Sequence, residues 1–305
     1  MIFGRAPDFP LGEMIKYSTP LFGSNLLVFL QSTIDKYVVF GLAGSAALGL
    51  YTPAIAAVTY ILMVPNSIIG VTFPKMCEAF GRGCIDEISR ISYLLSKYVS
   101  VICVPLAIGL SSVAYPTIEL FAGSRYSAGA PTLAIVSAIS ALICFGAIFN
   151  NIIMSINKTS VLFASNLLAI LSGAVVSFYL VPYLGATGAG IGRTSLLIVQ
   201  FLVPFIYLNR TKINRLNWNI FLKSLIASIV MSSGVLAVEL FMNSKYLLPL
   251  YLIVGATIYL IMVRFLKMLN KEDTSFLIDY LPARFRRIGS LLERFLLGSQ
   301  ITTSV

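Results

Sequence analysis

The sequence predicts an all-α polytopic membrane protein with about eight transmembrane helices. The chain has 305 residues, of which 58% are hydrophobic and only 11% are charged, whereas soluble domains carry roughly 25% charged residues. Its apolar runs repeatedly exceed the roughly 20 residues that a helix needs to cross a bilayer. So much apolar surface is unfavourable in water, and we therefore expect the lipid bilayer to be the solvent of this chain.

The apolar runs place the helices and divide the chain into segments. The first six helices predict a lobe over residues 13–208, and the last two an additional helix pair within residues 209–271. A short helix on the outer surface is expected near Tyr115–Gly123, and an uncharged loop, Leu42–Ala46, separates the first two spans. We expect the spans at residues 13–39, 46–72, 87–113, 127–155, 159–181, 187–208, 218–241 and 247–269.

Both ends of the chain predict segments at the membrane surface. Residues 1–12 hold Pro7 and Pro10 and indicate an interfacial lead-in. In residues 272–305, apolar side chains recur at helical spacing while arginines occupy other faces, which is typical of an amphipathic helix on an anionic inner leaflet. The apolar positions of this tail are Phe285, Ile288, Leu292 and Phe295.

Basic residues gather in alternate loops, and this alternation predicts the orientation. Cytoplasmic loops are enriched in Lys and Arg. The loop between the second and third spans holds Lys75 and Arg82, and the loop between the sixth and seventh holds Arg210 and Lys212, whereas opposite loops hold only Arg125 and Lys245. We therefore expect both termini in the cytoplasm. The net charge of +10 reflects this bias, and no nucleic-acid partner is expected.

Two rows of polar side chains run along the first span. Helical spacing makes the rows adjacent, so they predict one broad polar face. Such a face is costly against lipid and should confront protein or water. One row is Ser24, Gln31 and Asp35, and the other is Ser18, Asn25, Ser32 and Lys36.

Three features of the spans have two readings each. In the functional reading, Asp35 and Lys36 form a gate or contact the substrate. In the structural reading, they form an ion pair or snorkel to the membrane surface. Arg193 either attracts a phosphate group or pairs with Asp35. Asn66, between Pro65 and Pro74, lies either on a bent helix that faces a cavity or at a packed kink. The candidate cavity residues are thus Asn25, Gln31, Ser32, Asp35, Lys36, Asn66 and Arg193.

The residue inventory argues against catalysis and metal binding. The chain has no histidine, and its four cysteines have no CxxC spacing, which disfavours His-based catalysis, redox chemistry and a zinc site. We expect no catalytic residues, no metal and no cofactor. The glycine-rich stretch Gly185–Arg193 follows no predicted strand, so we interpret Gly188 and Gly192 as a GxxxG step for close helix approach.

An ordered set of short motifs resembles a known family. The motifs are IKYSTP, GLYTPA, VPNSIIGVTFPKM, SRYSAGAPTLAI, SINKTS and LVPYLGATGAGIG. In this order they resemble the second half of prokaryotic polysaccharide-exporting flippases, the O-antigen-flippase-like branch of the multidrug/oligosaccharidyl-lipid/polysaccharide transporter superfamily. The resemblance covers residues 13–208 by motif and the remainder by helix count.

The resemblance implies an activity and a set of partners. Members of the family move lipid-linked oligosaccharides between leaflets of the cytoplasmic membrane by alternating access of two lobes. Here the first lobe is missing, so a separate N-terminal lobe or a second copy of the chain is an expected partner, besides membrane lipids and the lipid-linked glycan. The chain is accordingly a fragment, half of a split transporter, or a remnant.

Three other functions stay open. A multidrug antiporter of the same superfamily would use buried acids to bind cations, and only Asp35 qualifies. A membrane glycosyltransferase or ligase usually needs a large outer loop with acidic or histidine residues, and the longest outer loop holds only Glu119 as an acid. A non-transporting membrane remnant is the third. The resemblance favours the flippase, which is not an enzyme.

Overall fold

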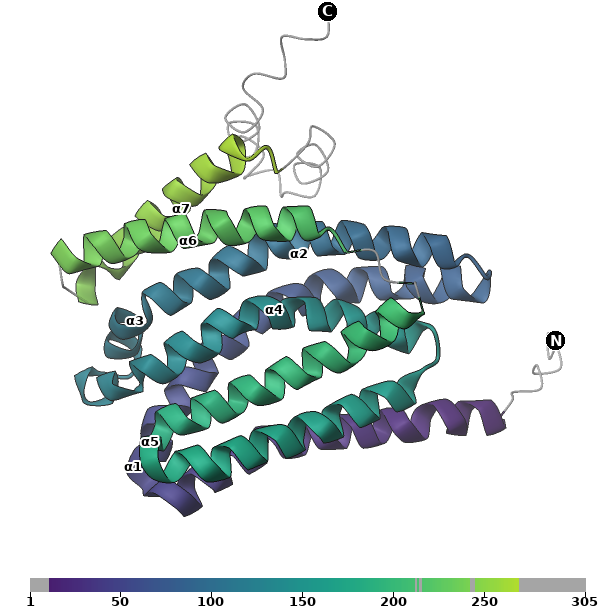
Figure 1. Ribbon diagram of the computed structural model, residues 1–305, viewed down its shortest axis with the longest axis horizontal. Helices are drawn as coiled ribbons and strands as arrows, with labels where there is room; N and C mark the ends of the chain where they lie inside the picture. The colour runs from purple at the N-terminus through teal and green to yellow at the C-terminus, as the bar shows by residue number, and fades with distance from the viewer. Residues whose placement is uncertain (1–10, 212, 214–215, 242–244, 269–305) are drawn as a thin grey trace, which may run out of the picture.

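The computed structural model describes residues 11–211, 213, 216–241 and 245–268, and these residues form helices without any strand (Figure 1). The lead-in over residues 1–10 and the tail over residues 269–305 lie outside the described residues. The elements are α1 (Leu11–Gly81), α2 (Ile85–Ser112), α3 (Ala114–Phe121), the 3-10 helix η1 (Ser124–Gly129), α4 (Ala130–Ser155), α5 (Thr159–Arg210), α6 (Trp218–Phe241), the 3-10 turn η2 (Lys245–Leu247) and α7 (Leu248–Phe265).

Two of these helices are hairpins. α1 has 71 residues and would measure roughly 100 Å if straight, about three times the hydrocarbon thickness of a bilayer. Gly44 in α1 (φ 79°) and Gly185 in α5 (φ 54°) leave the helical conformation and adopt positive φ, which glycine tolerates without a Cβ clash. Each glycine folds its helix back on itself, as Figure 1 shows.

The helices agree in number and type with the prediction, and differ from it at the turns. Six helices in the described part of the chain are long and apolar enough to cross a membrane, and α1 and α5 each contribute two spans once divided at Gly44 and Gly185. The break between the first two spans falls within the expected loop Leu42–Ala46, but the loop is shorter than predicted, because only Gly44 leaves the helical conformation there. The fourth span begins at Ala130 instead of residue 127, because the 3-10 helix η1 precedes it.

The connections between spans lie at two opposite ends of the bundle (Figure 1). The bends of α1 and α5 and the α3–η1 segment lie at one end. The α1–α2 and α4–α5 connections lie at the other. Arg82 and Lys158, in the α1–α2 and α4–α5 connections, lie at this second end, which the positive-inside rule would place in the cytoplasm.

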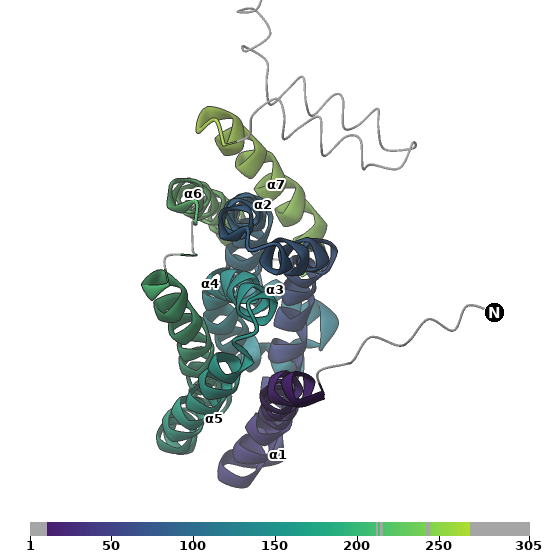
Figure 2. The ribbon, with the colours of Figure 1, turned by 90° about the vertical axis from the view of Figure 1, so that its right-hand side faces the viewer.

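Helix α4 lies at the centre of the core, where it packs against α1, α2 and α5 (Figure 2). Ile148, Phe149 and Ile152 of α4 are completely buried. Phe149 contacts Phe201 of α5, and Phe145 contacts Phe221 of α6 with ring centroids 5.0 Å apart. Aromatic pairs of this kind contribute about 0.5–1.5 kcal/mol beyond the area that they bury.

The additional pair α6–α7 packs on α2, away from the α1–α5 side of the bundle (Figures 1 and 2). The Ser224 hydroxyl donates to the carbonyl of Ser100 at 2.7 Å, and the Tyr259 hydroxyl donates to the carbonyl of Val101 at 2.8 Å. Interhelical hydrogen bonds of this type are modest individually, averaging about 0.6 kcal/mol in membranes. Several together, with close packing, join the pair to the lobe.

Candidate functional site

One polar row of α1 is buried against α5. Ser24 and Gln31 are each only 4% exposed. Asn166 of α5 donates from Nδ2 to the Ser24 hydroxyl at 2.7 Å, and Gln200, on the second arm of α5, donates from Nε2 to Asn166 Oδ1 at 2.7 Å. A buried amide chain therefore links the first arm of α1 to both arms of α5. Satisfied networks of this kind specify one arrangement of the helices.

An ion pair continues this row toward the turn of α1. Arg193 Nη1 lies 2.6 Å from Asp35 Oδ2, and the Tyr51 hydroxyl donates to the same oxygen at 3.3 Å. The side chains of Arg193 and Asp35 are 17% and 20% exposed. The sequence left two interpretations open for Arg193, and in the structure Arg193 pairs with Asp35. The three residues join both arms of α1 to the second arm of α5.

Gln31 lies between the amide chain and the ion pair along α1. Its Oε1 is buried and has no hydrogen-bond partner among the described residues, and the same holds for the hydroxyl of Thr194, which follows Arg193. A buried acceptor without a partner costs about 1–3 kcal/mol. The seam between α1 and α5 thus contains buried polar atoms at membrane depth that make no hydrogen bond.

The second polar row of α1 is exposed. Asn25, Ser32 and Lys36 lie on the surface of the chain, and the Ser32 hydroxyl donates to the carbonyl of Phe29 within its own helix at 2.8 Å. The expected single polar face is therefore divided: one row packs against α5, and the other borders exposed apolar side chains such as Leu26 and Phe29. The division arises because α5 covers only one side of α1.

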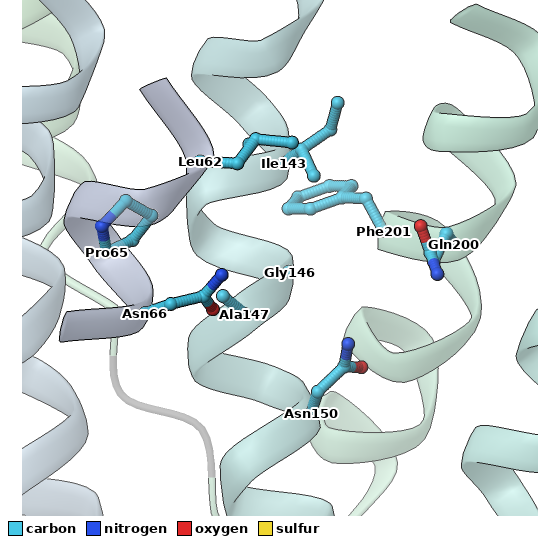
Figure 3. Close-up of a pocket in the computed structure, with 9 residues that line it drawn as sticks. All are labelled: Leu62, Pro65, Asn66, Ile143, Gly146, Ala147, Asn150, Gln200 and Phe201. Carbon is cyan, nitrogen blue, oxygen red and sulfur yellow. The ribbon is translucent and has the colours of Figure 1, made fainter. Parts of the chain in front are cut away.

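A polar cavity of about 110 Å³ opens among α1, α4 and α5 (Figure 3). Three amide side chains line it, Asn66 from α1, Asn150 from α4 and Gln200 from α5. Gln200 also belongs to the amide chain, so the cavity and the α1–α5 seam share a residue. The remaining lining residues are Leu62, Pro65, Ile143, Gly146, Ala147 and Phe201.

The structure thus separates the predicted cavity residues into four places. Asp35 and Arg193 pair, Gln31 is buried beside them, and Asn66 lines the cavity. Asn25, Ser32 and Lys36 lie on the exposed row. The backbone stays helical through Pro65 and Pro74, and Pro65 lies in the cavity wall.

Sequence reasoning missed Asn150, Asn166 and Gln200. Each is an amide inside an apolar span, and polar side chains at membrane depth point to the bundle interior or a water-filled cavity. That signal was available, but none of the three belongs to a row with helical spacing like that on α1. Only the packing of α4 and α5 brings them together.

A second cavity is larger and apolar. It has a volume of about 670 Å³ and lies among α1, α2, α3, α6 and α7. Its walls include Leu106 of α2, Met231 of α6 and Tyr251 of α7. Its lining is mostly aliphatic and aromatic, so it suits hydrocarbon. No group of three or more histidine, cysteine or acidic residues able to hold a metal occurs among the described residues.

Comparisons with known proteins agree with the motifs. Residues 8–131 match a family model described as polysaccharide biosynthesis protein, and no curated protein matches the sequence. Among solved structures, the chain is similar to lipid II flippase MurJ in its inward closed conformation, with a TM-score of 0.65 and 16% identity. The match covers 84% of this chain and 54% of that one.

These findings support the family that the motifs predict. The family model supports it for residues 8–131, and the structural match, at 16% identity, establishes a shared fold. The chain spans about half the length of that solved structure. The six long apolar helices of its described residues make it a multi-pass membrane protein.

Proposed function

We propose that this chain is one lobe, with an additional helix pair, of a polysaccharide-precursor flippase that moves lipid-linked oligosaccharides across the cytoplasmic membrane. The observation that carries the proposal is the amide-lined cavity among α1, α4 and α5, next to a buried polar seam. Polar groups are placed at membrane depth only where they face protein, water or a polar ligand. A sugar headgroup cannot cross hydrocarbon unaided, and a polar wall lowers that barrier.

The two cavities match the two chemical halves of such a substrate. The smaller cavity offers amides to a polar headgroup, and the apolar cavity offers a hydrocarbon surface to a lipid chain. The family-model match supports the same substrate class. The chain acts here as a translocator, not an enzyme, with both termini in the cytoplasm.

A translocator of this kind needs a second surface. The match leaves nearly half of the solved structure without a counterpart in this chain, so the proposed passage lies between this lobe and a separate N-terminal lobe or a second copy of the chain. The exposed row of Asn25, Ser32 and Lys36 faces away from α5. The partner would cover this surface, or the surface would line the passage.

The multidrug antiporter receives less support. Such a transporter requires a free acid in the membrane to bind cations, and Asp35 is engaged by both Arg193 and Tyr51. A paired carboxylate is already neutralised by its partner.

Deletion of the gene in the organism that encodes the chain tests the proposal. Lipid-linked oligosaccharide should accumulate in the cytoplasmic leaflet while exported glycan falls, and the wild-type gene should restore export. Mass spectrometry of extracted lipids and antibody or lectin staining of intact cells measure the two quantities. Unchanged lipid-linked intermediates and unchanged surface glycan would contradict the proposed function.

A further inference from the structure

The amides of the smaller cavity differ in how far their hydrogen-bonding groups are used. Asn66 and Asn150 make no hydrogen bond with any described residue, although both line the cavity. Gln200 uses one N–H on Asn166. Asn151, next to Asn150 but absent from the cavity wall, donates to the carbonyl of Ala147 at 2.8 Å. The unused groups are therefore those that face the cavity (Figure 3).

An amide offers two donors and one acceptor oxygen with two lone pairs. Three amides around one small space can surround a group that both donates and accepts. The amide chain also orients Gln200: because its Nε2 donates to Asn166 Oδ1, its carbonyl oxygen and second N–H stay available.

The cavity wall carries no charge. Its nine lining residues are amides, aliphatic residues, glycine, proline and Phe201. Phosphate recognition in proteins relies on Arg, Lys or clusters of backbone N–H groups, and the nearby cation Arg193 is engaged by Asp35. The chemistry of this wall therefore suits a neutral polar group with an apolar flank, which Phe201 and Leu62 can contact.

We infer that Asn66, Asn150 and Gln200 form a recognition site for the neutral sugar of the transported lipid, binding its hydroxyl or acetamido groups. The inference rests on the proposed function and makes it more specific: these amides recognise the sugar and not the phosphate. The cavity, at about 110 Å³, has room for several waters, so it accepts the edge of one sugar unit.

Binding of two lipid probes to the purified full chain in nanodiscs tests this site. One probe is a polyprenyl pyrophosphate that carries a single N-acetylglucosamine, and the other is the same polyprenyl pyrophosphate without sugar. Native mass spectrometry gives an apparent Kd for each. The wild type should bind the sugar-bearing probe more tightly. Asn66→Ala and Asn150→Ala should each weaken that binding roughly threefold to tenfold, the usual size of one net hydrogen bond, and leave the bare probe unchanged.

Asn151→Ala is the matched control, since this residue is an amide on the same helix that does not line the cavity. It should leave both affinities unchanged. Thermal unfolding checks that each variant is folded. If Asn150→Ala is unstable, Asn66→Ala decides the matter, because the Asn66 side chain is exposed and its loss leaves no buried void.

The outcomes separate this inference from the proposed function. Loss of the sugar-dependent affinity in the two amide variants supports the site. Variants that keep it, variants that lose affinity for both probes equally, or a wild type that binds both probes equally would overturn the site. In each of these cases the wild type still binds the lipid, so the proposed function stands. A wild type that binds neither probe would contradict the proposed function and the inference built on it.

Discussion

Arg193 Nη1 and Asp35 Oδ2 lie 2.6 Å apart although 158 positions separate the two residues in the chain. The contact joins the first arm of α1 to the second arm of α5, two turns of helix beyond the Gly185 bend. Because Tyr51 also donates to Asp35, the same carboxylate holds the second arm of α1. This ion pair therefore fixes the relative position of both hairpins near their turns.

The first prediction concerns the stability of this ion pair. Arg193→Met should lower the free energy of unfolding by about 1–3 kcal/mol, because it leaves Asp35 largely buried without its counter-charge. The double variant Asp35→Asn, Arg193→Met should lose less, since it removes both charges and keeps an acceptor for Tyr51. Thermal unfolding in detergent compares the variants. A double variant less stable than Arg193→Met would show that the charges are not coupled in this way.

The second prediction concerns Lys36. This lysine is exposed and has no ion-pair or hydrogen-bond partner in the described part of the chain, so it is free to contact an anionic lipid headgroup. Lys36→Ala should reduce glycan export about tenfold, the scale of one charge-assisted hydrogen bond, and should leave the amount of membrane protein unchanged. Export is measured by surface glycan staining, and Lys36→Arg should retain most of it. Full export by Lys36→Ala would make this lysine a plain snorkelling residue.

The third prediction concerns the wet side of α1. Asn25 and Leu26 are adjacent and both exposed, but they point about 100° apart around the helix. In a cysteine-free background, Asn25→Cys should react with a water-soluble maleimide in intact membranes, because it faces the proposed passage. Leu26→Cys, at the same depth, should react far more slowly because it faces lipid. Equal and slow reaction at both positions would place the polar row in the hydrocarbon.

The fourth prediction concerns close packing within the α5 hairpin. A Cβ on Gly192 would clash with the Ser177 hydroxyl, and one on Gly173 would lie 2.8 Å from Leu196 Cβ. Gly192→Leu should therefore destabilise the protein by about 1–3 kcal/mol through overpacking. Gly41→Ala is the control: it is also helical, but an added Cβ meets nothing within 4 Å. Tolerance of Gly192→Leu, measured by thermal unfolding, would mean that the two arms of α5 are not in tight contact.

The fifth prediction concerns topology. Ser45 and Arg125 are exposed at the end of the bundle that holds Gly44 and Gly123, whereas Cys84 is exposed at the opposite end. Ser45→Cys and Arg125→Cys, with the natural cysteines removed, should label with an impermeant maleimide from outside the cell. Cys84 alone should label only after permeabilisation. The glycines themselves are avoided because their positive φ strains any other residue. The reverse labelling pattern would overturn the inside-positive orientation.

The helical architecture was predictable because membrane spans follow from hydropathy alone. The bends were less so. Leu42–Ala46 is typical of a loop because four of its five residues are small, yet small residues are also compatible with helix, and the chain turns at the single residue Gly44. The row Ser24, Gln31 and Asp35 was predictable from its spacing. Its burial was not, since the spacing cannot say which side of α1 another helix covers.

Composition and local order along the chain are enough to predict the fold class, the number of spans, the distribution of basic loops and the family resemblance. Which polar residues act together depends on the packing of the helices. This packing paired Arg193 with Asp35 and gathered Asn66, Asn150 and Gln200 around one cavity. The physical reason is that these contacts join residues on different helices, and their geometry depends on how α1, α4 and α5 pack and not on any local pattern.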